Sequence, residues 1–399
     1  MTNKFDIKTY IISLLLPIYG LVNALRNLRT KNIIVPITLF YAFVGLFSLY
    51  EGTNLDTARY AEWFEYACEL NKGFWDYHTS RATLQQVDFY TSLVTWFFSR
   101  FLSSPHLFIA ILAGIMGFVF AKNIDIVRSN TNLNSRTCLL FVLLVFVPQA
   151  VFFPHRWWTA MQVFLLGVIP YLLNGNKKYL WISVSSVFVH FSFMYMVVLL
   201  VGYIFMPKKG LLPLLVLFIA TALLSGFDFT QLTPYLESYL PGAQVERTTM
   251  YMEWENDEKN FLSQSATLFF KLSSIALFVT IYLRTNWYKD SRLKNLFIFT
   301  LLFASVTHVM SLSPVGVRFK DFTNIMITIF LIVFYSQNHD IKCDKVFKYC
   351  IPIFVYYVIY QIRGVLDCIG PGALVFGNFV DFFLIDDEVS VLGYIKQII

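Results

Sequence analysis

Residues 137–173 read TCLLFVLLVFVPQAVFFPHRWWTAMQVFLLGVIPYLL. Two long apolar runs flank one short polar interruption, PHRWW, at residues 154–158. A helix that crosses a bilayer needs about 17–25 mostly apolar residues, so each run is long enough to cross. An arginine deep in lipid costs roughly 2.5–3.5 kcal/mol, which favours a position for Arg156 at the mouth of a span. The stretch therefore predicts two membrane helices joined by a charged turn.

The composition extends this interpretation to the whole chain. Of 399 residues, 57% are hydrophobic and 14% are charged, whereas a soluble domain carries about 25% charged residues. We expect an all-α, polytopic integral membrane protein with about twelve transmembrane helices and no cleavable signal. The candidate spans are 10–25, 33–50, 105–121, 137–153, 156–173, 179–190, 191–206, 211–226, 264–284, 295–312, 318–336 and 346–366.

Two segments depart from a simple span. Residues 87–102 are short and carry Asp88 and Arg100, which predicts a re-entrant or interfacial helix. Residues 179–206 are too long for one span and contain HFS, which predicts two short helices that meet near His190.

The basic residues give the expected orientation. More than half of the 31 Lys and Arg fall in six short connections between spans, and such loops are usually cytoplasmic. A single transmembrane domain, 1–399, then has both termini outside. Its long external segments are 51–86, 227–263 and 367–399. The short turns at PHRWW, HFS and SPVGVRFK also face outward. Long loops with charged and aromatic residues are often functional, so we expect the site on this side.

Three ionisable residues at external span ends are the first site candidates. Arg156 has the planar fork that grips an anionic head group, and the alternative is an interfacial anchor beside tryptophans of the aromatic belt. His190 is flanked by apolar residues and is either functional or a core histidine bonded to Ser192. Arg318 opens a late span at the same expected depth as Arg156.

The first external loop supplies the remaining candidates. In a helix, Asp56, Arg59 and Tyr60 share one face through their i, i+3 and i+4 spacing. The alternative is an N-capped amphipathic surface helix. Asp88 either pairs with one of the arginines or caps its own short helix.

Signatures of other site classes are missing from the sequence. It has no phosphate-cradling glycine loop, no nucleophile elbow and no zinc spacing among its five cysteines. We therefore expect no cofactor and no metal. The net charge of +6 follows the loops, so we expect no nucleic-acid partner.

The order of the motifs resembles a known family. GTNLDTARY follows the second span, VDFY opens the next helix, and HRWWTAM, HFS and VRF come later in the chain. Together they resemble the EpsG-like, Wzy-type polysaccharide polymerases over about residues 1–366. VDFY departs from the pattern because it lacks a proline after its aspartate.

The resemblance implies a function on the outer face of the bacterial cytoplasmic (inner) membrane. Such polymerases join oligosaccharide repeat units carried on undecaprenyl pyrophosphate, to build O-antigen or capsule. The resemblance implies site roles for Asp56, Arg59, Tyr60, Arg156, His190 and Arg318, with Asp88 as a further candidate. Arginines would stabilise the leaving pyrophosphate, and His190 or Asp56 would act as the base. The implied partners are the lipid-linked oligosaccharides and the bilayer, with a chain-length regulator as a further candidate.

Three other functions fit parts of the pattern. A flippase for the same lipid-linked glycan predicts related halves and charges on both sides of the midplane. A membrane sugar O-acyltransferase predicts a His and Arg pair served by a cytoplasmic acyl donor. A lipid-linked glycosyltransferase predicts a catalytic acidic residue in the first external loop, where Asp56 lies.

Overall fold

The computed structural model describes residues 7–29, 32–49, 56–70, 72–82, 88–146, 155–206, 210–225, 261–284, 290–311, 318–338, 340–384 and 387–398. Most of the expected external segment 227–263 lies outside these residues, as do the side chains of Asp56 and His155. The described residues are helical, and the only strand-like pairing among them is an isolated bridge between Ser48 and Ile369. This confirms the predicted all-α class. The chain packs into two compact units, one of Met1–Leu133, Gln149–Leu200 and Ile362–Ile399, the other of Asn134–Pro148 and Val201–Gln361.

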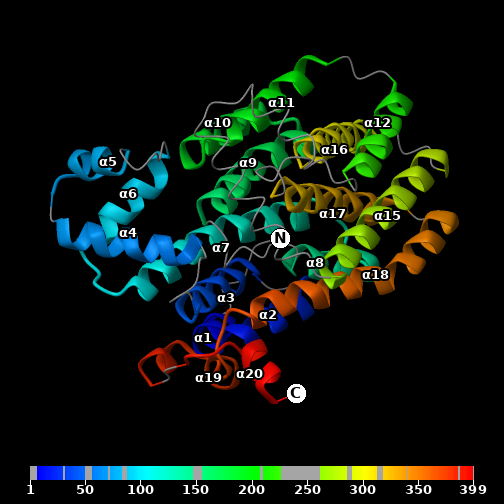
Figure 1. Ribbon diagram of the computed structural model, residues 1–399. Helices are drawn as coiled ribbons and strands as arrows, with labels where there is room; N and C mark the ends of the chain where they lie inside the picture. Colours follow the sequence, from blue (N-terminus) through cyan, green and yellow to red (C-terminus); the bar gives the residue numbers. More distant parts are fainter. Residues whose placement is uncertain are drawn as a thin grey trace. The chain divides into compact units, whose positions relative to one another are not determined.

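The first unit contains the N-terminal helices, the middle of the chain and the C-terminal segment (Figure 1). Its helices are α1 (Ile7–Leu15), α2 (Pro17–Arg26), α3 (Ile34–Leu46), α4 (Asp56–Leu70), α5 (Phe74–Ala82), α6 (Phe89–Phe98), α7 (Pro105–Ser129), α9 (His155–Asn174), η1 (Lys177–Tyr179), α10 (Leu180–Val189), most of α11 (Phe193–Phe205), α19 (Pro371–Phe376), η5 (Phe379–Phe383) and α20 (Val391–Ile398).

Small residues let the central helices of this unit approach closely. A Cβ atom added at Gly45 of α3 would lie 2.7 Å from the Cβ of Ala113 on α7. One added at Gly167 of α9 would lie 2.2 Å from Oγ of Ser183 on α10, whose hydroxyl donates to the Phe164 carbonyl at 2.8 Å. Close backbone approach through small residues is typical of membrane helix pairs. The contact between α9 and α10 brings the helix end at His190 alongside α9.

A polar contact links α7 to α9, and an apolar cluster links α4 to α7. Asn123 on α7 donates to both the backbone and side-chain oxygens of Gln162 on α9, each at 2.8 Å. Tyr60 and Phe64 on α4 form a buried cluster with Phe108 and Leu112 on α7. Because α4 also packs on α6, the helix after the second span is a packed element and not only a solvated surface helix.

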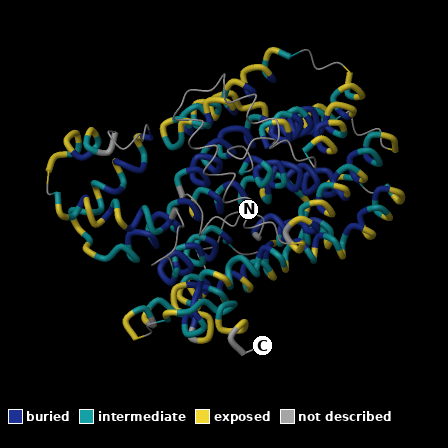
Figure 2. Tube along the Cα trace, viewed as in Figure 1, coloured by how far each residue is buried: buried dark blue, intermediate teal, exposed yellow. Residues whose placement is uncertain are grey.

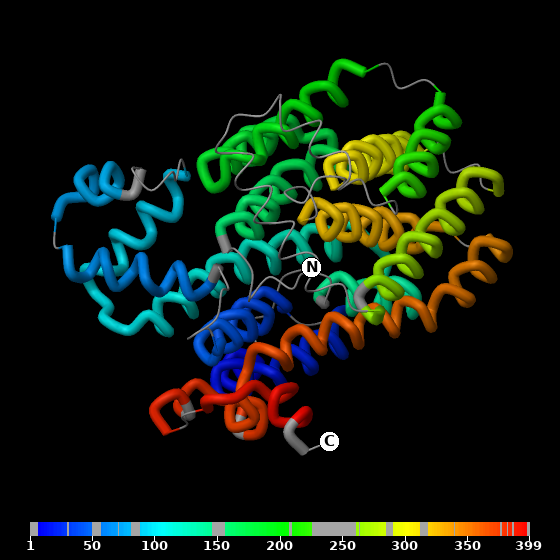
Figure 3. The backbone as a smooth tube through the Cα atoms, viewed as in Figure 1, coloured from blue at the N-terminus to red at the C-terminus, as the bar shows by residue number. Residues whose placement is uncertain are grey.

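The second unit contains α8 (Ser135–Phe146), α12 (Leu211–Leu224), α15 (Phe261–Arg284), α16 (Ser291–Met310), α17 (Phe319–Gln337) and most of α18 (Ile341–Leu366). α17 is buried along almost its whole length and packs on α16 and α8 (Figure 2). α15 and α18 lie side by side, yellow-green and orange in Figure 3. The ring of Phe270 there contacts Phe354 and Tyr357, with ring centroids 5.9 and 4.7 Å away.

Among the described residues, six helices have the length and hydropathy of a membrane span. They are Pro105–Ser129, Arg156–Asn174, Gln264–Arg284, Ser291–Met310, Phe319–Gln337 and Ile341–Leu366. With several shorter apolar helices, they indicate a multi-pass membrane protein, but the expected total of about twelve is not confirmed. The predicted first span is broken where α1 ends at Leu15 and Pro17 opens α2, because proline cannot donate to the preceding turn. The ten residues of α6 are too short to span.

Candidate functional site

Asp88 forms the centre of a polar cluster in the first unit. It holds the N-cap position of α6, but its side chain makes no cap hydrogen bond there. Instead, the buried carboxylate accepts from Arg156 Nη1 at 2.6 Å and from the backbone N–H of Phe191 at 2.9 Å. Of the two roles weighed for Asp88, pairing with an arginine is therefore the one observed. One carboxylate connects the starts of α6 and α9 to the break between α10 and α11.

Arg156 is the second residue of α9 and is not a lipid-facing anchor. The adjacent Trp157 and Trp158 are only 2% and 3% exposed, whereas belt tryptophans face the interface. Asp88 engages Nη1 alone, and Arg156 Nε is buried without a hydrogen-bond partner in the described part of the chain. The Nε and Nη2 edge is the fork that binds two phosphate oxygens at once. Asp88 thus fixes the guanidinium through Nη1, and no described residue bonds Nε.

His190 lies at the predicted break. α10 ends at Val189 and α11 begins at Phe193, so the expected pair of short helices is confirmed. His190 Nδ1 accepts the backbone N–H of Ser192 at 3.2 Å and lies 2.8 Å from the Ser192 hydroxyl. Because an acceptor nitrogen carries no proton, the neutral ring holds its proton on Nε2. In this arrangement His190 presents an N–H donor, and its role as a base stays a prediction.

Buried hydroxyls gather beside the pair of Asp88 and Arg156, and the sequence analysis missed them. Thr91 and Thr95 on α6 each have a buried oxygen without a hydrogen-bond partner among the described residues, and the hydroxyls of Tyr90 on α6 and Thr159 on α9 lie within reach of one another. At least about 90% of buried polar groups in proteins are paired, so such a group of unpaired oxygens is unusual. The sequence signal for these hydroxyls is the motif YTSLVT at residues 90–95, which places several of them in one short apolar helix. These hydroxyls can bind water or the hydroxyl groups of a sugar.

The candidates from the first external loop occupy α4 of the same unit. Tyr60 is buried, and its ring meets Trp63 edge-on with centroids 5.3 Å apart. Tyr60 also lies close enough to Tyr90 of α6 for a charge on Tyr60 to act on the Tyr90 phenol. Arg59 is half-buried on the same helix. α4 begins at Asp56, whose side chain is outside the described part.

Arg318 belongs to the second unit, where it is half-buried and directly precedes α17. The structure therefore brings together Asp88, Arg156 and His190 and does not test the expected anion site shared by Arg156 and Arg318. That shared site stays a prediction.

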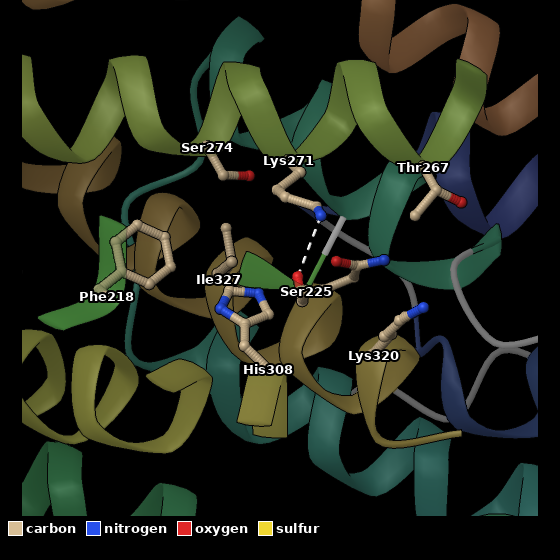
Figure 4. A pocket seen from close by; sticks show the side chains of 9 residues that line it. Phe218, Ser225, Thr267, Lys271, Ser274, His308, Lys320 and Ile327 are labelled. Atoms are coloured by element: carbon tan, nitrogen blue, oxygen red, sulfur yellow. Dashed lines mark hydrogen bonds between the residues drawn. The ribbon is translucent and has the colours of Figure 1, made fainter. Parts of the chain in front are cut away.

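The second unit holds a small cavity of about 20 Å³ that the sequence analysis missed. Lys271 of α15, His308 of α16 and Lys320 of α17 line it (Figure 4). Lys271 was detectable as a charge inside the apolar run LFFKLSS, yet that run was assigned only as a span. The described residues contain no group of three His, Cys, Asp or Glu side chains able to hold a metal ion.

Comparison with known proteins gives one match. The family model described as EpsG family matches residues 10–370, which is most of the chain. No curated protein and no solved structure matches. The match covers every helix of the cluster around Asp88 and every helix that lines the cavity of the second unit. Together with the apolar helices, it supports a polysaccharide polymerase-like role in a membrane. The chain belongs to the EpsG family.

Proposed function

We propose that the protein is a glycosyltransferase that joins undecaprenyl-pyrophosphate-linked oligosaccharide repeat units on the outer face of the bacterial inner membrane. Its product would be an O-antigen or capsule polysaccharide. The observation that carries the proposal is the cluster of Asp88, Arg156 and His190. It combines an oriented guanidinium fork with an imidazole donor in a chain of the EpsG family.

The fork suits the leaving group of this reaction. The bond between the anomeric carbon and the pyrophosphate oxygen breaks, and the electron pair leaves with the pyrophosphate. Negative charge grows on its oxygens as the bond lengthens, so donors already aimed at them stabilise the transition state most. Arg156 supplies two such donors from its Nε and Nη2 edge, and His190 supplies a third from Nε2. Arg59 and Arg318 are further candidates to bind the anion.

The acceptor sugar supplies the other half of the reaction. Its hydroxyl oxygen attacks the anomeric carbon, and its proton passes to a base. His190 and Asp56 were the two expected bases. The bond from the Ser192 amide to His190 Nδ1 favours Asp56 for this role, because a carboxylate accepts a proton without any change of tautomer. Tyr60 and Tyr90 are our candidates for contacts with sugar oxygens.

The length of α9 supports an outward orientation for the cluster. Arg156 lies at the start of this 20-residue helix, and the basic residues Lys177 and Lys178 follow its end. At 1.5 Å per residue the helix is about 30 Å long, which matches the hydrocarbon thickness of a bilayer. Since short basic loops are usually cytoplasmic, Arg156 belongs at the external surface.

Deletion of the gene tests the proposal. Loss of a polymerase leaves single repeat units on the cell surface, visible as one band in place of a ladder on a polysaccharide gel. Loss of a flippase leaves no surface glycan of this type. Loss of an O-acyltransferase leaves chains of full length that lack acyl groups. A plasmid copy of the wild-type gene restores the ladder as the control. Loss of all surface glycan of this type, or chains of full length that lack acyl groups, contradicts the proposed reaction.

A further inference from the structure

The C-terminal segment that follows α18 is docked on the first unit by hydrogen bonds (red in Figure 1). The backbone N–H of Leu49, just beyond α3, donates to the Cys368 carbonyl at 2.9 Å. Asp387 accepts two backbone N–H groups at the start of α19, at 3.2 and 3.1 Å. The match to the family model ends at residue 370, so most of this segment lies beyond it. The segment is therefore a fixed element whose role the family match does not supply.

The 3₁₀ helix η5 within this segment has two distinct sides. A 3₁₀ helix completes one turn in three residues, so the side chains at positions i and i+3 lie on the same side. Phe379 and Phe382 share the first side of η5, and Val380 and Phe383 share the second. The spacing therefore sorts four apolar side chains into two pairs.

The first side of η5 packs on the ends of two helices. The ring of Phe379 meets Phe43 in the last turn of α3 edge-on, with centroids 5.8 Å apart. The ring of Phe382 lies 6.2 Å from that of Phe47, just beyond α3, and 5.7 Å from that of His106 in the first turn of α7. At 1.5 Å per residue, the 25 residues of α7 are about 37 Å long, whereas the hydrocarbon core of a bilayer is about 30 Å thick. The first turn of α7, and η5 with it, therefore belongs at the membrane interface.

The second side of η5 is apolar and exposed. Val380 is 62% exposed, and Phe383 and the adjacent Leu384 are each 78% exposed. Contiguous exposed apolar side chains mark contact with another surface. α1 also packs on α3, and it exposes Ile11 and Leu14 as a lipid-facing helix does. Both elements that pack on α3 thus leave apolar side chains without cover among the described residues.

We propose that η5 and Leu384 form an interfacial anchor, whose exposed side lies in the boundary between the head groups and the acyl chains of the bilayer. Elements of this kind lie in the plane of the interface and bury their apolar side about 5–10 Å into it. The partner is the lipid of the membrane that the chain itself spans, because η5 lies at the level where α3 and α7 end. The anchor fixes the depth of these two helix ends. The inference rests on packing and exposure and not on the polymerase reaction.

Spin labels test the depth of this side in the full-length protein, held in nanodiscs of phosphatidylethanolamine and phosphatidylglycerol. Phe383→Cys and the matched control Glu388→Cys, at an exposed position of the same segment, each provide one labelling site in a cysteine-free background. Collisions of the label are measured with oxygen, which concentrates in lipid, and with a nickel chelate, which stays in water. The ratio of oxygen to nickel collisions should be several-fold higher at position 383 than at position 388.

Two results of this measurement overturn the proposal. An equal ratio at the two positions means that the side chain at position 383 lies in water. Shielding of position 383 from both reagents means that a second copy of the chain or another protein covers it.

Photolabelling of the wild-type protein needs no substitution and provides a second readout. A phospholipid that carries a diazirine near the top of its acyl chain is added to the nanodiscs, and the insertion sites are mapped by mass spectrometry. Insertion into Val380, Phe383 and Leu384 should exceed insertion into Phe379 and Phe382 several-fold, because these two rings face α3 and α7. Equal insertion into both sides of η5, or none into the segment, overturns the proposal.

Discussion

Substitution of Asp88 probes both the fold and the site of the first unit. Asp88→Ala removes the two bonds at 2.6 and 2.9 Å and leaves the Arg156 guanidinium and the Phe191 N–H without their partner. Removing one member of a buried ion pair costs about 3–5 kcal/mol. Asp88→Asn keeps the shape and one acceptor, so it exchanges a charge-assisted bond for a neutral one at a cost of about 1–2 kcal/mol.

Thermal unfolding of the purified protein measures the loss of stability in the two Asp88 variants. A loss of 1 kcal/mol lowers Tm by about 2–4 °C in domains of 150–250 residues, so Asp88→Ala should lower it by roughly 6–20 °C. Asp88→Asn should lower it by only a few degrees and still reduce polymer output about tenfold or more, because the Arg156 fork is no longer held. The matched control is Asp125→Asn, which removes the 2.5 Å ion pair with Arg128 on α7 and should leave output unchanged.

A double-mutant cycle then isolates the pair. If Asp88 and Arg156 act together, Asp88→Asn and Arg156→Gln should show a coupling free energy of about 0.5–3 kcal/mol. Additive effects on Tm, or wild-type chain lengths from Asp88→Asn, would refute the reasoning that Asp88 positions Arg156.

Three further predictions concern His190, the helix packing and the orientation. His190→Gln retains an N–H donor, so its polymer output should stay within about tenfold of the wild type. His190→Ala loses the donor, and its output should fall about 10²-fold. Equal defects in the two variants would support a role for His190 as a base. Gly167→Ala should cost about 1–3 kcal/mol in thermal unfolding, because its methyl group would lie 2.2 Å from a hydroxyl of α10. Gly202→Ala, which meets nothing within 4 Å, should be neutral or stabilising, and equal costs would contradict the packing argument. In a cysteine-free background, a cysteine at Asn176 should resist an impermeant thiol reagent applied to whole cells and one at Asn256 should react; labelling at Asn176 would reverse the orientation.

The helices could be predicted wherever the sequence carries a long apolar run. Residues 105–121 and 156–173 each fall within one helix, and the polar HFS marked the break at His190. The run at 10–25 misled the analysis, because hydropathy averages over the proline that opens α2. Several other runs form helices of 10–14 residues, so their apolar length exceeds their helical length.

The candidate site could be predicted by residue type but not by contact. Arg156 and Asp88 attracted notice because ionisable residues near lipid are costly. Their pairing joins residues 68 positions apart in the chain and forms only where the fold brings the starts of α6 and α9 together. Lys271 and His308 escaped notice because each lies inside an apolar run. Their significance arises only when α15 and α16 place them around one cavity.

The length distribution of polysaccharide made by Arg156→Lys tests the central claim most directly. Lysine keeps the positive charge and loses the planar fork, so the substitution separates bidentate binding of pyrophosphate from simple charge. Cells whose only copy carries Arg156→Lys should make single repeat units in place of a ladder, with the protein present at the wild-type level in the membrane. Arg128→Lys, which alters the ion pair on α7, should leave the ladder intact. A ladder of wild-type length from Arg156→Lys would contradict the account.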